Sequence, residues 1–301
     1  MEENVAIPFI SYTPEHGFKL NDEVVGFLET LQQRIGVISV CGKYRTGKSY
    51  LLNKLFLENL NQEEPTKPRK VGFNVGPTIE PCTKGLWIWK ETFYAPQDSR
   101  KELPILIIDT EGLGAFDEEE NHDAKIFLLA ILLSSLLVYN SVGSIDENAL
   151  NNLSLVVNLS KTLQIKSGEK VEDPDEMAEY FPVFYWVVRD FALQLRDMEG
   201  NEITPKTYLE NALKEQKGTS DSIENKNRIR RLIRLFFKDR DCFTLVRPVE
   251  DERNLQKLEG LDPSALREEF VEQLGQLKSK TLRKVKPKQI RGKYVNGPML
   301  Y

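Results

Sequence analysis

The chain contains 301 residues, of which 40% are hydrophobic and 29% are charged, a composition typical of a water-soluble globular protein. Its formal net charge of −5 gives no reason to expect nucleic acid as a partner. The three cysteines, Cys41, Cys82 and Cys242, are too widely spaced for a metal-binding or disulfide pattern, so we expect reduced thiols. The acidic first residues lack the apolar core of a secretion signal, which favours a cytoplasmic protein.

The first forty residues predict a strand, a helix and a second strand. The first strand covers residues 9–12, and a turn at 14–17 separates it from a helix over about 21–33. Asn21 is the predicted N-cap of that helix, because its side chain can accept a hydrogen bond from the first helical turn. The apolar run 35–41 then predicts a buried strand.

Residues 42–49, Gly-Lys-Tyr-Arg-Thr-Gly-Lys-Ser, fit the phosphate-binding motif G-x-x-x-x-G-K-[ST]. The motif follows a predicted strand and precedes a predicted helix over 50–56, which is the context that it requires. Backbone N–H groups and a helix dipole then point at one place, where a polyphosphate fits. We therefore predict a nucleotide-binding protein in which Lys48 bridges the β- and γ-phosphates and Ser49 ligates Mg²⁺. A chance match within a turn is the alternative.

A long polar loop and a long apolar run mark the middle of the chain. Residues 59–82 form the loop, and long loops beside a nucleotide site are often mobile switches. Strands are predicted over 83–92 and 103–108, and helical patterns dominate 122–165. The apolar run 126–139 is shorter than the roughly 20 residues of a spanning helix, so we expect a helix or strand in the core.

The second half of the chain continues the alternation of strands and helices. A buried strand is predicted over 181–188 and a last strand over 243–246. Helices are predicted over 204–217, 227–237 and 263–280. This alternation predicts an α/β fold with a mostly parallel sheet that helices cover on both faces.

Asp109 is the first candidate for chemistry outside the motif. It ends a predicted apolar strand about sixty residues after the motif, where its carboxylate would lie near Mg²⁺. An aspartate that caps a helix is the alternative. Gly112, in the same Asp-x-x-Gly pattern, would present its N–H to the γ-phosphate. Thr83 is a candidate second Mg²⁺ ligand, although composition alone favours a threonine at a strand edge.

Two charged residues are candidates for reading the base and for stabilising the transition state. Asp190 follows the strand at 181–188 and could accept hydrogen bonds from N1–H and N2–H₂ of guanine, which adenine lacks. A simple cap is its alternative role. Arg45 could reach the charge that develops between the β- and γ-phosphates. Its alternative is a surface arginine paired with an acid.

These segments together resemble guanylate-binding proteins, which are dynamin-related large GTPases. The likeness runs in order from about residue 8 to the end of the chain. It is carried by residues 40–53, 83–89, 109–114, 133–141, 189–191, 204–209, 242–249 and 295–298. The resemblance implies a Ras-like P-loop NTPase with large-GTPase insertions over residues 1–280. Residues 281–301 would then be a linker to a C-terminal helical domain that this chain lacks.

The resemblance also implies hydrolysis of GTP to GDP, and in some members to GMP, with Mg²⁺ as cofactor. Two copies would form a homodimer through their nucleotide faces, with Arg45 as an internal arginine finger. Glu111 would belong to the network that activates water, and Lys48 and Thr83 would complete the catalytic set. Mg²⁺ would be held by Ser49, Thr83 and Asp109. The nucleotide would be bound by Gly42, Lys43, Tyr44, Arg45, Thr46, Gly47, Lys48, Ser49, Tyr50, Thr83, Gly112, Arg189, Asp190, Arg247 and Pro248.

Three features depart from the family pattern. Pro81 stands where the family often has a serine that polarises the attacking water, and residues 250–253 are mostly acidic where the guanine cap is usually basic. The third departure is the absence of the C-terminal helical domain, so larger assemblies or membrane attachment would depend on a region beyond residue 301. Pro81 also makes a rival function conceivable, a GTP-loaded interaction switch or membrane-associated scaffold with little turnover. The basic segment 278–293 could contact anionic lipid or nucleic acid, but a solvated linker is the simpler interpretation.

Overall fold

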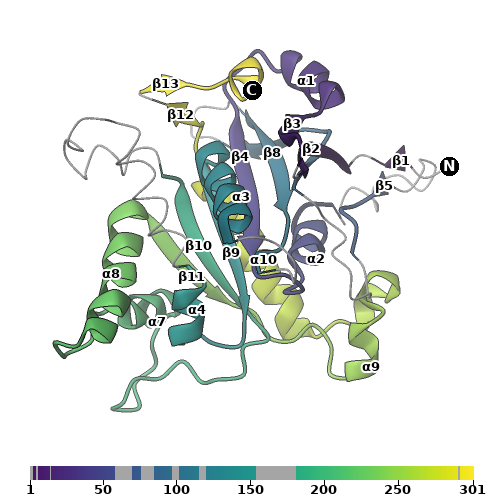
Figure 1. The fold of residues 1–301 in the computed structure, drawn as a ribbon. Helices are drawn as coiled ribbons and strands as arrows, with labels where there is room; N and C mark the ends of the chain where they lie inside the picture. Colours follow the sequence, from purple (N-terminus) through teal and green to yellow (C-terminus); the bar gives the residue numbers. More distant parts are fainter. Residues whose placement is uncertain are drawn as a thin grey trace.

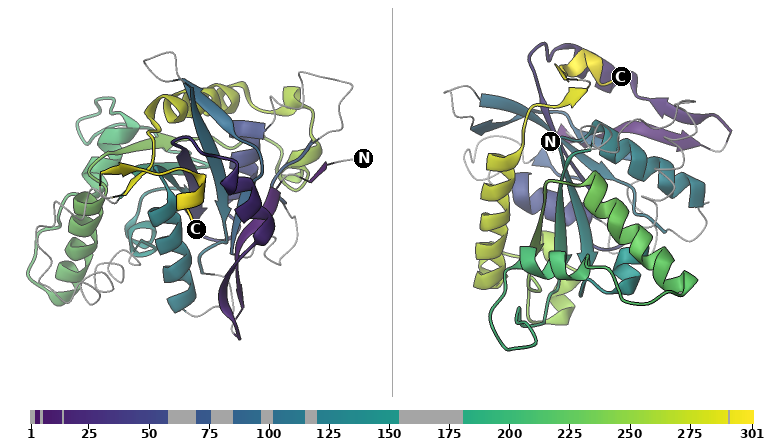
Figure 2. Two further views of the ribbon diagram at one scale, coloured as in Figure 1. Left: turned by 90° about the horizontal axis from the view of Figure 1, so that it is seen from above. Right: turned by 90° about the vertical axis from the view of Figure 1, so that its left-hand side faces the viewer.

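The computed structural model of the chain describes residues 3–4, 6–13, 15–57, 70–75, 85–96, 102–114, 120–153, 181–290 and 292–301. In the described part of the chain, one twisted sheet forms the centre of the fold, and helices cover both of its faces (Figures 1 and 2). The predicted α/β fold with a mostly parallel sheet is therefore confirmed.

The strand that precedes the phosphate motif lies in the interior of this sheet. The strands are β2 (Ala6–Thr13), β3 (Gly17–Leu20), β4 (Gly36–Gly42), β6 (Leu86–Trp89), β7 (Phe93–Pro96), β8 (Glu102–Thr110), β9 (Leu136–Val142), β10 (Val183–Arg189) and β11 (Arg240–Thr244). Their order is β11-β10-β9-β4-β8-β6-β2-β3, and β7 also pairs with β8. The strands from β11 to β8 are parallel, whereas the others join antiparallel. β4 is buried along its whole length between β8 and β9, as its apolar sequence predicts.

Helices on opposite faces of the sheet bury two separate hydrophobic clusters. The helices are α1 (Asp22–Glu29), α2 (Lys48–Leu52), α3 (Glu120–Leu133), α4 (Glu147–Asn151), α7 (Pro205–Ala212), α8 (Asp221–Phe236), α9 (Glu252–Leu255) and α10 (Glu268–Lys284). Side chains of α1, α3 and α8 belong to one cluster, and side chains of α2 and α10 belong to the other. Two short strand pairs lie outside the sheet: β1 (Glu3–Asn4) with β5 (Lys70–Val71), and β12 (Gln289–Ile290) with β13 (Lys293–Tyr294).

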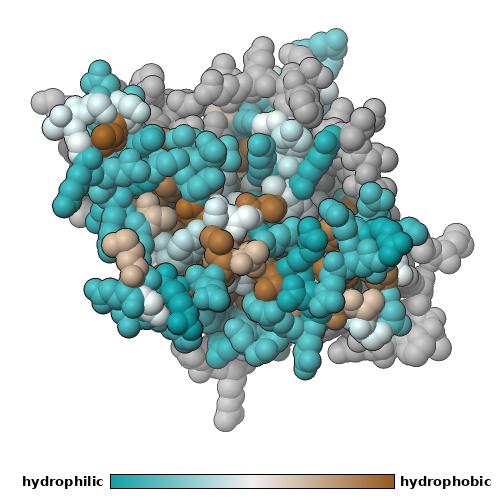
Figure 3. Space-filling model, turned by 90° about the horizontal axis from the view of Figure 1, so that it is seen from below, coloured by the Kyte–Doolittle hydropathy of each residue, from teal (hydrophilic) through white to brown (hydrophobic). Residues whose placement is uncertain are grey.

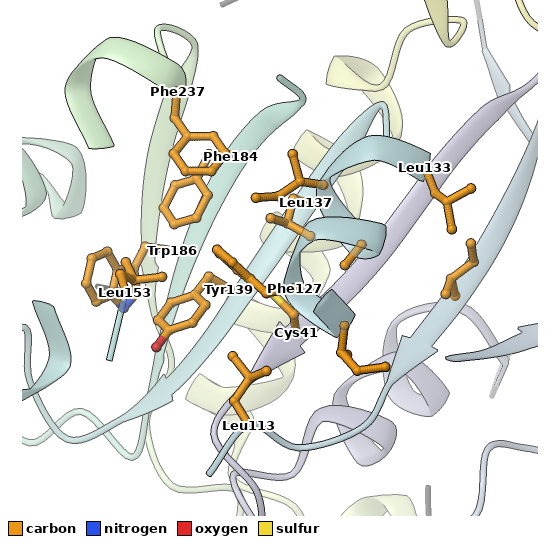
Figure 4. Packing of buried hydrophobic residues seen from close by; sticks show 14 of the residues in the cluster. Cys41, Leu113, Phe127, Leu133, Leu137, Tyr139, Leu153, Phe184, Trp186 and Phe237 are labelled. Carbon is orange, nitrogen blue, oxygen red and sulfur yellow. The ribbon is translucent and has the colours of Figure 1, made fainter. Parts of the chain in front are cut away.

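The side chains of β4 alternate between these two clusters. Val37 and Cys41 face the cluster under α3, whereas Ile38 and Val40 face the cluster under α2. In the first cluster, Phe127 of α3 lies over side chains of the sheet that include Cys41 and Tyr139 (Figure 4). Since both faces of β4 are packed, the turn that follows it begins from a rigid base.

The helical prediction for residues 122–165 is wrong at its centre. Residues 136–142 form strand β9, which pairs with β4 on one side and with β10 on the other. The apolar run 126–139 therefore contains the end of α3 and the start of β9. A helix buried against a sheet and a strand inside a parallel sheet are both apolar, so periodicity does not distinguish them. In the described residues, no helix is long and apolar enough to cross a membrane.

Most other element boundaries differ from the predictions by a few residues. Asn21 caps α1 as predicted, with its side chain accepting the Glu23 N–H at 2.9 Å. Helix α8 begins at Asp221 instead of residue 227, because Ser220 caps it. The predicted helix at 50–56 is α2 followed by a π-helical turn, Asn53–Leu57. Most of the predicted loop 59–82 lies outside the described residues.

The segment after α10 packs against the start of the central strand. Ile35, just before β4, accepts the Lys288 N–H at 2.8 Å and donates to the Val295 carbonyl at 3.1 Å. The Gly297 N–H reaches the Leu31 carbonyl at 2.8 Å, and the Val295 side chain is fully buried. The described residues from 285 to 290 and from 292 to 301, which belong to the expected linker 281–301, thus include residues that contact the body of the domain.

Candidate nucleotide-binding site

The candidate site lies at the carboxyl ends of the parallel strands, on the lower side of the molecule in Figure 1. Ligands of open α/β sheets bind at this edge. Seen from below, this face is mostly hydrophilic, with smaller apolar areas near its centre (Figure 3).

Two glycines of the phosphate motif are required by the backbone path. Gly42 has a φ of 146°, and a β-carbon there would lie 2.1 Å from the Asn140 carbonyl oxygen of β9. Gly47 has a φ of 73° and precedes α2. Arg45 also has a positive φ, 58°, which is uncommon for a residue with a side chain. Such strain persists where the surrounding structure enforces it, and it is concentrated at functional sites.

Lys48, Ser49 and Asp109 converge where α2 begins. The Ser49 hydroxyl donates to Oδ2 of Asp109 at 2.5 Å, and the Asp109 side chain is fully buried. Nζ of Lys48 lies 3.4 Å from the Lys43 carbonyl. Burial lowers the pKa of Lys48, while the carboxylates of Asp109 and Glu111 oppose that shift. Ser49 and Asp109, both predicted to hold Mg²⁺, are therefore adjacent, while metal binding itself stays a prediction.

The Asp-x-x-Gly segment is hydrogen-bonded directly to the phosphate motif. The Leu113 N–H donates to the Gly42 carbonyl at 3.1 Å, and the Leu113 carbonyl accepts the Tyr44 N–H at 3.0 Å. A β-carbon at Gly112 would lie 2.4 Å from Cα of Tyr44, so this close approach requires glycine. The two loops therefore form one unit, although about seventy residues separate them in the sequence.

Glu111 is buried beside this unit and bonded to the chain just before β6. Its carboxylate oxygen Oε2 accepts the Gly85 N–H at 2.7 Å, and its own N–H donates to the Gly85 carbonyl at 2.8 Å. Oε2 also lies 3.2 Å from Nε2 of His122 in α3. The sequence analysis missed His122, and the available signal was that the chain has only two histidines.

Arg189, the last residue of β10, contacts the phosphate motif. It is buried, and Nη1 donates to the Gly47 carbonyl at 3.2 Å. Its guanidinium lies 5.7 Å from the ring centre of Tyr50 and 6.0 Å from that of Phe270 in α10. Burial lowers the pKa of Arg189. Arg189 thus joins β10 to the motif and to α10.

Asp190 and the segment at 245–248 lie together at the end of β10. The Leu245 N–H donates to the Val188 carbonyl at 2.9 Å, and its carbonyl accepts the Phe191 N–H at 3.0 Å. Arg247 and Pro248 follow Leu245 two and three residues later, and their predicted contact with the nucleotide stays a prediction. Asp190 has a φ of 54°, and its Oδ1 is buried without a hydrogen-bond partner in the structure. A buried acceptor of this kind suits a ligand that donates hydrogen bonds.

Of the remaining residues that were predicted to belong to the site, some lie in the part of the chain that the structure describes and others lie outside it. Thr83 and Pro81 lie outside the described residues. Thr46 accepts a 2.8 Å hydrogen bond at its carbonyl from the Asn140 side chain, which the sequence analysis did not assign to the site. The Arg45 guanidinium lies 5.3 Å from the ring centre of Tyr44.

The oxygen atoms of this site fit a nucleotide-bound Mg²⁺. Mg²⁺ usually takes one or two protein carboxylates or hydroxyls, together with phosphate oxygens and water. Ser49 and Asp109 offer such a pair beside the Lys48 ammonium. In the described residues no group of three or more His, Cys, Asp or Glu side chains forms a self-contained metal site.

Comparison with known proteins places the chain in a family. The family model described as "Guanylate-binding protein, N-terminal domain" matches residues 15–290. Guanylate-binding protein 1 of Mus musculus is 37% identical over 286 residues, which cover 93% of this chain and 46% of that protein. Guanylate-binding protein 7 of Mus musculus and guanylate-binding protein 1 of Homo sapiens are each 38% identical over 287 residues. The chain spans less than half the length of these relatives. It belongs to the guanylate-binding protein family, in the part that corresponds to the N-terminal domain.

Proposed function

We propose that this chain binds GTP together with Mg²⁺ and hydrolyses it to GDP. The observation that carries the proposal is the convergence of Lys48, Ser49 and Asp109 at the end of β4. An ammonium group, a hydroxyl and a carboxylate in this arrangement suit a triphosphate and its metal ion. Membership of the guanylate-binding family supports GTP as the nucleotide.

The proposed reaction depends mainly on positioning and charge. Lys48 stabilises negative charge on the phosphoryl group, and the Glu111 carboxylate orients the attacking water. Mg²⁺ held by Ser49, Asp109 and the predicted ligand Thr83 would neutralise charge on the β- and γ-phosphates. A strong base is unnecessary, because phosphoryl transfer is catalysed chiefly by placement and electrostatic stabilisation.

Guanine recognition is assigned to Asp190. Its buried Oδ1 without a partner supports this role, since guanine offers two adjacent donors and adenine does not. The hydrogen bonds of Leu245 to Val188 and Phe191, on either side of Asp190, support a cap over the base formed by the residues that follow.

We further propose a homodimer that forms through the nucleotide faces, with Arg45 as the internal arginine finger. Arg45 is exposed and has a positive φ within the phosphate motif. An exposed guanidinium at this place can be ordered by a partner and then contact the transition state. Specific activity should therefore rise with protein concentration.

Residues 1–280 are proposed to form the GTPase domain, and residues 281–301 to lead into a further domain. The matched segment covers 46% of the curated relatives, so those proteins have room for a further domain. Larger assemblies or membrane contact would reside in that further domain, and the cytoplasmic location expected from the sequence stays a prediction.

Product analysis tests the proposed function. The chain would be incubated with Mg²⁺ and either GTP or ATP at several protein concentrations, and the nucleotides separated by chromatography. We expect GDP from GTP, with or without GMP, and little product from ATP. Lys48→Ala should abolish the reaction, whereas Lys19→Ala, on the exposed strand β3, should not. Retention of GTP without product would favour the interaction switch, and equal use of ATP would contradict guanine recognition.

A further inference from the structure

The Glu111 carboxylate is held by donors from two separate parts of the chain. The Gly85 N–H donates to Oε2 at 2.7 Å, and Nε2 of His122 lies 3.2 Å from the same oxygen. A carboxylate oxygen accepts hydrogen bonds, so we assign the donor role in this pair to Nε2 of His122. The exposed fractions of Glu111 and His122 are 4% and 5%. Such hydrogen bonds, away from bulk water, restrict the carboxylate to one orientation.

The first turns of α3 hold the 111–114 segment at both of its ends. His122 contacts the Glu111 side chain, while the next residue, Asp123, accepts the Gly114 N–H at 2.5 Å. Between these points Leu113 is hydrogen-bonded to the phosphate motif. Helix α3 therefore sets the position of Glu111 relative to the motif, and it does so through two consecutive side chains.

An aromatic pair from the N-terminal hairpin covers the His122 imidazole. Tyr12 and Phe18 are directly opposite each other on β2 and β3. The Tyr12 ring centre is 4.5 Å from that of His122, and the Phe18 ring stacks on the imidazole at 6.3 Å and 9°. Lys125 lies over Tyr12 at 5.9 Å from its ring centre. The imidazole is thus confined between two rings and the carboxylate, which limits its rotation.

We propose that His122 is a positioning residue of the GTPase reaction. Its Nε2–H and the Gly85 N–H together engage Oε2 of Glu111, and Oε1 is the oxygen assigned to the attacking water. The hairpin of β2 and β3 supports this arrangement by fixing the imidazole. The inference rests on the proposed function, because Glu111 must first take part in hydrolysis.

Two substitutions at residue 122 distinguish the effect of losing the hydrogen-bond donor from the effect of changing the side-chain volume. His122→Gln keeps an N–H at about the reach of Nε2, whereas His122→Leu keeps an apolar side chain of similar size and removes the donor. We expect His122→Leu to lower kcat about tenfold to a hundredfold, as misplacement of a catalytic group does. GTP affinity and KM should stay within about twofold, because only the transition state is affected. His122→Gln should retain most of the wild-type kcat.

Glu111→Ala and the double variant Glu111→Ala/His122→Leu separate this inference from the proposed function. Wild-type turnover in Glu111→Ala would contradict the role of Glu111 itself. If Glu111→Ala is slow and His122→Leu is not, the proposed function stands and the inference is overturned. The double variant should be no slower than Glu111→Ala alone, since the two side chains act through one carboxylate. A further loss of the full His122→Leu factor would also overturn the inference.

Urea unfolding of each variant shows whether it is folded before rates are compared. If His122→Leu does not fold, the pair His122→Gln and His122→Asn provides the test. The shorter asparagine amide cannot reach the position of Nε2, so a slow His122→Asn protein beside an active His122→Gln protein supports the proposal. Equal kcat in these two variants would contradict it.

Discussion

The phosphate end and the base end of the candidate site are built in different ways. At the phosphate end, polar groups of the protein already bond to one another: Ser49 to Asp109, Lys48 to a carbonyl, and Glu111 to Gly85. At the base end, Asp190 has a strained backbone and a buried oxygen without a partner in the structure.

The two ends of the site are thus arranged for a ligand in two different ways. A phosphate site must hold charges in place before reaction, so its groups are oriented by protein contacts. A base site discriminates by leaving an acceptor that only the correct donor can satisfy, because an unmet acceptor is costly. Substitutions at the base end should therefore change which nucleotide binds, whereas substitutions at the phosphate end should change how fast it reacts.

The largest effect is expected from Asp190→Asn. The amide reverses one donor–acceptor pair at the base edge, so affinity for GTP should fall about a thousandfold or more and affinity for xanthosine triphosphate should rise. Titration with fluorescent analogues of both nucleotides measures the change, and Asp197→Asn, an exposed aspartate on the following loop, is the control. Unchanged GTP affinity would show that guanine is read elsewhere.

Arg45→Ala should lower turnover at least about a hundredfold while GTP affinity changes little, since the guanidinium acts on charge that develops in the transition state. Single-turnover rates and equilibrium titrations distinguish the two quantities. The wild-type rate per molecule should also rise with concentration, and a flat dilution series would remove the link to dimerisation.

Gly112→Ala tests whether the phosphate end depends on close backbone packing. The added β-carbon would meet the Tyr44 backbone, so we expect a loss of about 1–3 kcal/mol in unfolding free energy and a slower reaction. Gly26→Ala is the matched control, because nothing lies within 4 Å of its added β-carbon. Equal stability of the two variants would mean that the loops are not tightly joined.

Pro81→Ser should increase turnover by a few-fold only, because the serine hydroxyl could hold water that proline cannot. Glu111→Ala should reduce turnover more than it does in a serine-bearing relative, since Glu111 would carry more of that task here. Rates measured at saturating GTP test both expectations. A Pro81→Ser protein that binds GTP normally but reacts no faster would contradict this interpretation.

Lys288 lies away from both ends of the candidate site. Its substitution should therefore change the stability of the protein and not its nucleotide binding or turnover. Its ammonium donates to the Ser134 carbonyl at 2.8 Å, and burial lowers its pKa from 10.5 to about 8. The unfolded chain therefore binds more protons at this lysine between pH 8 and pH 10.5, so the contribution of Lys288 to stability rises with pH across that window. Buried thiols and phenols such as Cys41 and Tyr139 contribute with the opposite sign, because burial raises their pKa. Urea melts of wild type and Lys288→Met at pH 7 and pH 10 measure the slope. The stability gained between pH 7 and pH 10 should be smaller in the variant than in the wild type. That difference isolates Lys288, because Lys278 and the buried thiols and phenols are present in both proteins.

Local sequence patterns predicted the elements that depend on short-range rules. The phosphate motif after an apolar strand and the Asn21 cap of α1 are examples. Each depends on hydrogen bonds or dihedral angles within a few residues, which the residue types largely determine. Boundaries were less accurate, because the capping residue and not the apolar pattern sets where a helix begins.

The sequence by itself determined the family and the α/β class, and it indicated the residues that we propose for phosphate chemistry. Only the tertiary structure decided that residues 136–142 form a central strand, that Arg189 supports the phosphate motif, and that His122 contacts Glu111. These three features depend on contacts between residues distant in the chain, and a buried side chain is apolar or hydrogen-bonded whichever neighbour supplies the contact. Local pattern therefore indicated which groups would be buried or chemically active, while packing between elements determined which groups they meet.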